Sequence, residues 1–101
     1  MREWLARVQH DLVKRLLWPA RDRRDLGGAA RPGELLPRLV DEEGRPVAPL
    51  DLWRALRQEA PHGAALDAFE GALESAIKAA QAGDVEGVLR LEAAFAALAG
   101  R

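Results

Sequence analysis

Apolar residues recur at steps of three and four through the last third of the chain, from residue 64 to residue 99. The apolar positions are Leu66, Phe69, Leu73, Ala76, Ile77 and Ala80, followed by Val85, Val88, Leu91, Phe95 and Leu98. Such steps place side chains on one face of an α-helix. Between the two runs, Gly83 suits the left-handed position that ends a helix, and Asp84 suits an N-cap. The pattern predicts an antiparallel helical hairpin over residues 64–99.

A second amphipathic pattern covers residues 3–17. The apolar positions on its main side are Trp4, Leu5, Val8, Leu12 and Leu16. Val13 and Leu17 fall outside this stripe, which indicates a helix that is contacted on more than one face. The residue before a proline is disfavoured in α geometry, so Trp18-Pro19 predicts that the helix ends or kinks at Trp18. Pro19 then opens a short helical turn through Leu26.

The middle of the chain is rich in glycine and proline. Residues 27–33 hold three glycines and a proline, which predicts an internal linker. Residues 34–40 are expected to form a short helix. Residues 41–48 are expected to be a turn or loop, across which Leu39-Val40 and Val47 either pair as a small hairpin or do not pair. Pro49 starts a further helix that reaches residue 60.

These elements predict an all-α fold, a small helical bundle of four or five helices with a C-terminal antiparallel helical hairpin and a Gly/Pro-rich middle segment. The hairpin is expected to pack against helices 3–17 and 49–60. A length of 101 residues fits a single helical domain over residues 1–101. Alanine and leucine dominate the apolar residues, and both are good helix formers.

The composition removes several classes of chemistry. The chain has no cysteine, which excludes disulfides, thiolate nucleophiles and cysteine-ligated metal sites. His10 and His62 are the only histidines, and no metal-ligand spacing includes either of them. The sequence therefore predicts a protein that is not an enzyme and that uses no metal or cofactor. An enzyme built around His10 or His62 is the weakest hypothesis.

Three carboxylates, Asp67, Glu70 and Glu74, follow one side of the first hairpin helix. Paired carboxylates can perform acid–base catalysis when a pocket separates their pKa values. These three lie beside a strongly patterned apolar stripe, where solvated charges are expected. They are therefore interpreted as an acidic solvent face.

The leading functional hypothesis is a protein–protein interaction or scaffold module that self-associates as a homodimer; the other form of this hypothesis is an adaptor for another chain. It is motivated by the wide apolar stripe of helix 3–17 and by the alanine-rich segment 93–99, which permits close helix approach. The expected contact residues are Leu5, Leu12, Leu17 and Trp18. Tryptophan is the preferred residue at interface hot spots, and Trp18 is the best candidate because it stands at the predicted helix break beside the arginines; burial in the core is the alternative for this residue.

The alternative hypothesis is a nucleic-acid-associated regulator. Its expected phosphate contacts are Lys14, Arg15, Arg21, Arg23 and Arg24. Asp22 and Asp25 lie within reach of these arginines at i,i+3 spacing, so intramolecular ion pairs are the favoured interpretation. The formal net charge of −1 is also far from that of a dedicated DNA-binding domain.

No segment approaches the roughly 18 consecutive apolar residues that span a bilayer. Charges interrupt the apolar runs at the N-terminus, so a signal peptide is not predicted. A cytoplasmic location is the expectation, and membrane binding by helix 3–17 is disfavoured because Glu3 and Asp11 lie on it. The frequent use of Arg, Ala, Gly and Pro is typical of a high-GC bacterial genome.

Overall fold

The computed structural model describes residues 2–27, 30–59 and 63–100 and contains a small helical bundle with a minute two-stranded sheet. The helical elements are α1 (Arg2–Val8), the π-helical turn η1 (Gln9–Val13), α2 (Lys14–Asp25), α3 (Pro49–Arg57), α4 (Ala64–Ala82) and α5 (Val85–Ala99). The strands β1 (Leu39–Val40) and β2 (Pro46–Val47) pair antiparallel. The predicted helical bundle is confirmed, and α3 ends at Arg57, before the predicted residue 60, which lies outside the described residues.

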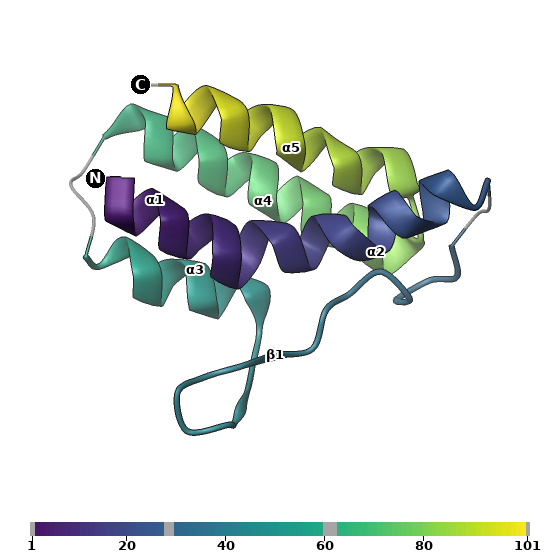
Figure 1. Ribbon diagram of the computed structural model, residues 1–101, viewed down its shortest axis with the longest axis horizontal. Coiled ribbons are helices and arrows are strands. Elements are labelled where there is room, and N and C mark those ends of the chain that lie inside the picture. Colours follow the sequence, from purple (N-terminus) through teal and green to yellow (C-terminus); the bar gives the residue numbers. More distant parts are fainter. Residues whose placement is uncertain (1, 28–29, 60–62, 101) are drawn as a thin grey trace.

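Helices α1 and α2 are joined through η1 into one continuous rod, which crosses the front of the bundle in Figure 1. The predicted end of the helix at Trp18 is wrong, because α2 runs through Pro19 to Asp25. A proline inside a helix removes one backbone hydrogen bond. Here Leu17 and Ala20 are buried on either side of Pro19. Their burial favours continued helical geometry despite the missing donor.

The π turn explains a stripe of apolar residues that a regular helix does not account for. The N–H of Lys14 donates to the carbonyl of Gln9, five residues earlier, so η1 takes one more residue than an α turn. This extra residue rotates the rest of the rod. As a result Val13 and Leu17 become buried together with Leu12, although they lie outside the regular stripe.

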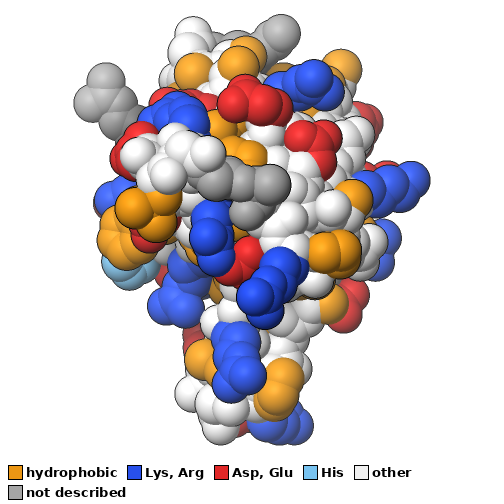
Figure 2. All heavy atoms as spheres, turned by 90° about the vertical axis from the view of Figure 1, so that its right-hand side faces the viewer, with side chains coloured by type: hydrophobic (Ala, Val, Ile, Leu, Met, Phe, Trp, Pro, Cys, Tyr) orange, Lys and Arg blue, Asp and Glu red, His pale blue; other side chains and the backbone are white. Residues whose placement is uncertain are grey.

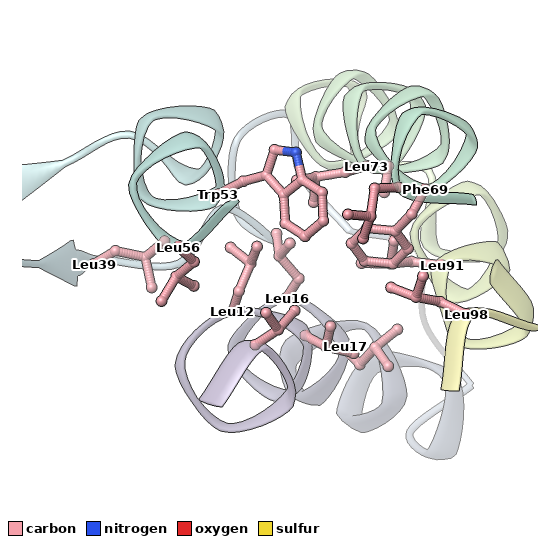
Figure 3. Close-up of a cluster of buried hydrophobic side chains, with 14 of the residues drawn as sticks. Leu12, Leu16, Leu17, Leu39, Trp53, Leu56, Phe69, Leu73, Leu91 and Leu98 are labelled. Atoms are coloured by element: carbon pink, nitrogen blue, oxygen red, sulfur yellow. The ribbon is translucent and has the colours of Figure 1, made fainter. Parts of the chain in front are cut away.

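Trp53 of α3 occupies the centre of the main core, among the leucines of the rod, α4 and α5 (Figure 3). Its ring centroid lies 5.8 Å from that of Trp4 and 4.9 Å from that of Phe69. Both indole N–H groups have partners: Trp53 Nε1 donates to Glu70 over 2.8 Å, and Trp4 Nε1 donates to the carbonyl of Leu56 over 2.5 Å. These bonds remove the cost of burying the two donors.

The C-terminal hairpin forms as the sequence predicts. Gly83 has a left-handed φ of 76°, and the side chain of Asp84 accepts a hydrogen bond of 3.1 Å from the N–H of Gly87. The predicted linker lies against this turn, since the N–H of Gly33 donates to the carbonyl of Gln81 over 2.9 Å. Residues 28 and 29 of the linker lie outside the described part of the chain. Residues 30–33 are therefore a docked segment of the fold.

The predicted helix over residues 34–40 is wrong, because this segment runs as turns and extended chain into β1. Leu35 packs with Ala20, Ala80 and Val88, whereas Leu39 packs into the main core. A helix would place residues 35 and 39 on the same face, so it could not deliver them to two separate clusters. Of the two possibilities for residues 41–48, the hairpin is correct, with Leu39 opposite Val47.

Candidate functional site: a groove beside Trp18

The four residues expected at a contact with another chain have different places in the structure. Leu12 and Leu17 are buried in the core of this chain, and Leu5 is partly buried against that core. Neither leucine is therefore a surface residue of this fold: Leu12 lies on the regular apolar stripe that faces the core, and the π turn brings Leu17 to the same side. Trp18 is 58% exposed, the most exposed of the three tryptophans.

Trp18 lies in an open groove of about 460 Å³, which we call the Trp18 groove. Its lining residues are His10, Lys14, Arg15, Trp18, Pro19, Asp22, Pro37 and Arg38. One wall is the rod, on which His10, Lys14, Trp18 and Asp22 follow one another at four-residue steps and so share one face. The other wall is the segment of Pro37 and Arg38 that leads into β1. This second wall could not be predicted from the sequence, because no local signal connects residues 37–38 with residues 10–22.

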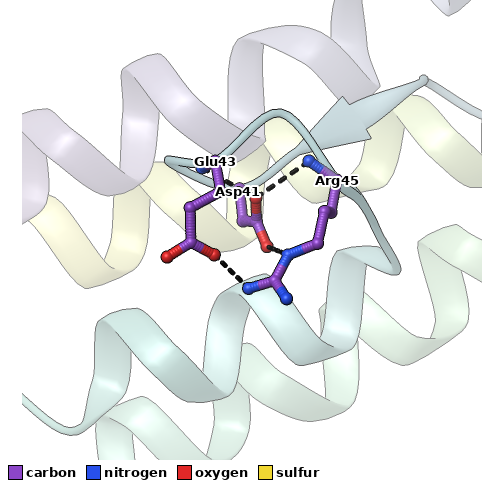
Figure 4. A network of polar contacts seen from close by, with 3 residues as sticks. All are labelled: Asp41, Glu43 and Arg45. Carbon is purple, nitrogen blue, oxygen red and sulfur yellow. Dashed lines mark hydrogen bonds and ion pairs between the residues drawn. The ribbon is translucent and has the colours of Figure 1, made fainter.

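The wall at residues 37–38 is held from both sides. Leu35 and Leu39 are buried on either side of it. Beyond Leu39 the hairpin is closed by Asp41, whose Oδ1 accepts hydrogen bonds of 2.9 Å from the N–H groups of Glu43 and Arg45 (Figure 4). The guanidinium of Arg45 also forms ion pairs with the carboxylates of Asp41 and Glu43. These contacts order the turn and fix the chain that borders the groove.

The Trp18 groove carries three cationic side chains, Lys14, Arg15 and Arg38, and one carboxylate, Asp22. Within the described ranges, none of the three cations forms an ion pair with a carboxylate of the chain. Basic side chains are also spread over the neighbouring end of the molecule, the face that Figure 2 shows. The lining of the groove therefore combines the apolar side chains of Trp18, Pro19 and Pro37 with an excess of positive charge.

The five basic residues expected to bind phosphate divide into two groups. Lys14 and Arg15 line the groove, whereas the other three pair with carboxylates of the chain. The pairs are Arg21 with Glu92 at 3.0 Å, Arg24 with Asp25 at 3.5 Å, and Arg23 with Glu34. Intramolecular ion pairs do form, but none of these three has the expected i,i+3 spacing: Glu92 and Glu34 lie outside α2, and Asp25 is the immediate neighbour of Arg24.

A second groove, of about 480 Å³, lies between the rod, the β1–β2 hairpin and α3. Its charged lining comprises Arg7, Asp11, Arg15, Asp41, Glu42, Glu43 and Glu59. Arg7 is already paired with Glu59 over 2.5 Å. This groove is mostly acidic, and Arg15 lines both grooves.

The alanine-rich segment 93–99 borders only a small hollow of about 120 Å³ between α4 and α5.

The interpretation of Asp67, Glu70 and Glu74 as a solvated face is wrong for Glu70. Its carboxylate is half-buried and accepts hydrogen bonds from Trp53 Nε1 and from Arg57, the latter over 3.2 Å. Asp67 also binds the guanidinium of Arg57, and this hydrogen bond is the largest factor that raises the pKa of Arg57 above its ordinary value. Glu70 thus joins α3 to α4, a structural role.

The histidines are not brought together with metal-ligating groups in the described ranges. His10 is exposed at the rim of the Trp18 groove, and His62 lies outside the described residues. In residues 2–27, 30–59 and 63–100, no group of three or more His, Asp or Glu side chains is arranged to hold a metal ion.

Over the same ranges no helix combines the length and apolarity that crossing a membrane requires.

Comparison with known proteins adds no family to these observations. No protein-family model matches the chain, and the searches of curated proteins and of solved structures find no match either.

Proposed function

We propose that this chain is a non-enzymatic protein–protein interaction module whose contact surface is the Trp18 groove. The observation that carries the proposal is the 58% exposure of Trp18 beside a formed groove. A fully buried tryptophan covers roughly 150–250 Å², and a partner could still cover the 58% of Trp18 that is exposed. Anchors of this kind dominate the binding energy of protein interfaces.

The core of the fold contains the other two tryptophans and not Trp18. Trp4 and Trp53 are buried and hydrogen-bonded, and they account for the contribution of tryptophan to the core. Trp18 points away from that core, next to a leucine that is buried in it. A polar residue would suit such a position equally well. A partner that covers Trp18 would explain its presence.

The proposal can be tested by photo-cross-linking from position 18. Benzoylphenylalanine replaces Trp18 in one version of the chain and exposed Glu74 of α4 in a matched version. Both are irradiated in extracts of the cells that make the protein. A discrete protein adduct from position 18 and none from position 74 would support the proposal. No adduct from position 18, or equal adducts from both positions, would contradict it.

The size of the adduct separates two forms of the proposal. An adduct of twice the chain mass, with a purified chain that is dimeric by light scattering, would identify a second copy as the partner. An adduct of any other mass would identify a different protein.

A further inference from the structure

We infer that the Trp18 groove binds an acidic peptide segment that carries an apolar side chain over Trp18. This inference rests on the proposed function and names the chemistry of its partner. Three observations support it: the unpaired cations of the groove, the length of the rod that lines it, and the pairing of most other arginines within the chain.

Charge complementarity is the first argument. Lys14, Arg15 and Arg38 have no carboxylate partner among the described residues, and they line the groove together with Trp18. Carboxylates placed opposite them would form charge-assisted hydrogen bonds. Complementary charge at the rim also speeds association and selects among partners. An apolar peptide without carboxylates would leave these cations uncompensated.

The shape of the groove is the second argument. His10 and Asp22 are separated by twelve residues of helix, or about 18 Å at 1.5 Å per residue. An extended peptide advances about 3.3 Å per residue, so roughly five or six residues cover this length. Asp22 lies at one end, so the two ends of the groove differ in charge. Carboxylates are expected near Lys14 and Arg38, and they are disfavoured beside Asp22.

The same charges argue against a second copy of this chain bound face to face. A two-fold axis through the groove would place its three cations opposite those of the partner, with only two Asp22 side chains to offset them. Like charges brought together across an interface are destabilising.

Nucleic acid is the less favoured occupant for a related reason. Phosphate binding gains affinity with the number of phosphates neutralised, and this groove offers three cations. Arg21, Arg23 and Arg24, which could have extended it, are paired with carboxylates. The sequence pI of about 6.1 is also well below that of a dedicated nucleic-acid-binding domain.

The test is a selection from a displayed library of random dodecapeptides against the full chain. Selected peptides are expected to contain several Asp or Glu residues around one large apolar residue. Their affinity is expected to fall about ten-fold in Trp18→Ala and in the double variant Lys14→Glu/Arg38→Glu, and to weaken as salt is raised. The matched control Lys78→Glu/Arg90→Glu reverses two exposed cations on the hairpin and should change affinity less than about two-fold. Circular dichroism checks that each variant is folded.

The possible failures can be told apart. Peptides that need Trp18 but carry no excess of acid would overturn the inference and leave the proposed function standing. Tighter binding to a single-stranded oligonucleotide than to any selected peptide would overturn it in favour of nucleic acid. If no peptide is enriched, the inference is wrong. If position 18 also gives no cross-link, the proposed function is wrong as well.

Discussion

At the scale of single residues, Leu17 and Trp18 show how adjacent side chains acquire opposite roles. Neighbouring residues on a helix point about 100° apart, so when one faces the core the other faces away from it. Leu17 is 3% exposed and Trp18 is 58% exposed. The sequence predicts both at a contact with another chain: Leu17 because it lies off the stripe of helix 3–17 at regular α spacing, and Trp18 because it stands at the predicted helix break.

Substitutions at these two positions should therefore separate folding from binding. Leu17→Ala removes core packing and is expected to lower the free energy of unfolding by about 2–5 kcal/mol. Trp18→Ala should change it by less than about 1 kcal/mol, because this side chain is mostly in water. Urea unfolding followed by circular dichroism measures both. A large loss of stability in Trp18→Ala would mean that Trp18 serves the core rather than a partner.

Glu70 provides a second test at this scale. Glu70→Ala leaves the buried indole N–H of Trp53 without its acceptor, which should lower the free energy of unfolding by about 1–3 kcal/mol. Glu74→Ala, one turn further along α4 and exposed, should change it by less than about 0.5 kcal/mol. Urea denaturation of the two variants makes the comparison, and equal effects would show that the Trp53 contact does not stabilise the fold.

At the scale of elements, the turn between α4 and α5 is where local and tertiary requirements meet. Gly83 is needed locally because its φ of 76° is unfavourable for other residues. It is needed again because a Cβ at this position would lie 2.5 Å from the carbonyl oxygen of Ala30. The linker can approach the hairpin closely only because this residue has no side chain.

Alanine substitutions at Gly71 of α4 and at Gly83 of the turn after it should have opposite effects on the free energy of unfolding. Gly83→Ala is expected to lower the free energy of unfolding by about 1–3 kcal/mol through its left-handed backbone, before any displacement of the linker is considered. Gly71→Ala lies on an open face in the middle of α4, with no heavy atom near the added Cβ, and should raise it by about 0.5–1 kcal/mol. Thermal unfolding of both variants measures the contrast. Stabilisation by Gly83→Ala would contradict the docking of the linker at this turn.

At the scale of the whole molecule, the main core contains residues from the rod, β1, α3 and the helical hairpin of α4 and α5. The rod lies along α5, and α3 lies against α4 (Figure 1). This is the packing expected for helices 3–17 and 49–60 against the hairpin. The Trp18 groove exists only because a segment twenty residues further along the chain returns to the rod.

The oligomeric state is a property of the molecule as a whole. The excess of positive charge in the Trp18 groove disfavours face-to-face pairing, so the purified chain is expected to be monomeric by light scattering at low salt. Rising salt screens like charges, so association that appears only at high salt would be consistent with this reasoning. A dimer at low salt that Trp18→Ala dissociates would show that the groove binds a second copy.

The sequence by itself determined the helices and the turn that joins the last two of them. Apolar periodicity depends on neighbours three and four residues away, and the roles of Gly83 and Asp84 depend on backbone geometry at one junction. Both are local properties, which a sequence displays directly. The same local information predicts that the first helix ends or kinks at Trp18 and that residues 34–40 form a helix. In the structure α2 runs on through Pro19, and residues 34–40 do not form a helix.

Only the tertiary structure decided which surfaces remain exposed. The π turn that directs Leu17 inward, the course of α2 through Pro19 and the return of Pro37 and Arg38 to the rod all depend on residues far apart in sequence. Burial of apolar side chains in a shared core is strong enough to outweigh the local preferences of a proline or a short segment. For this reason the class of fold could be predicted from the sequence, whereas the candidate site could not.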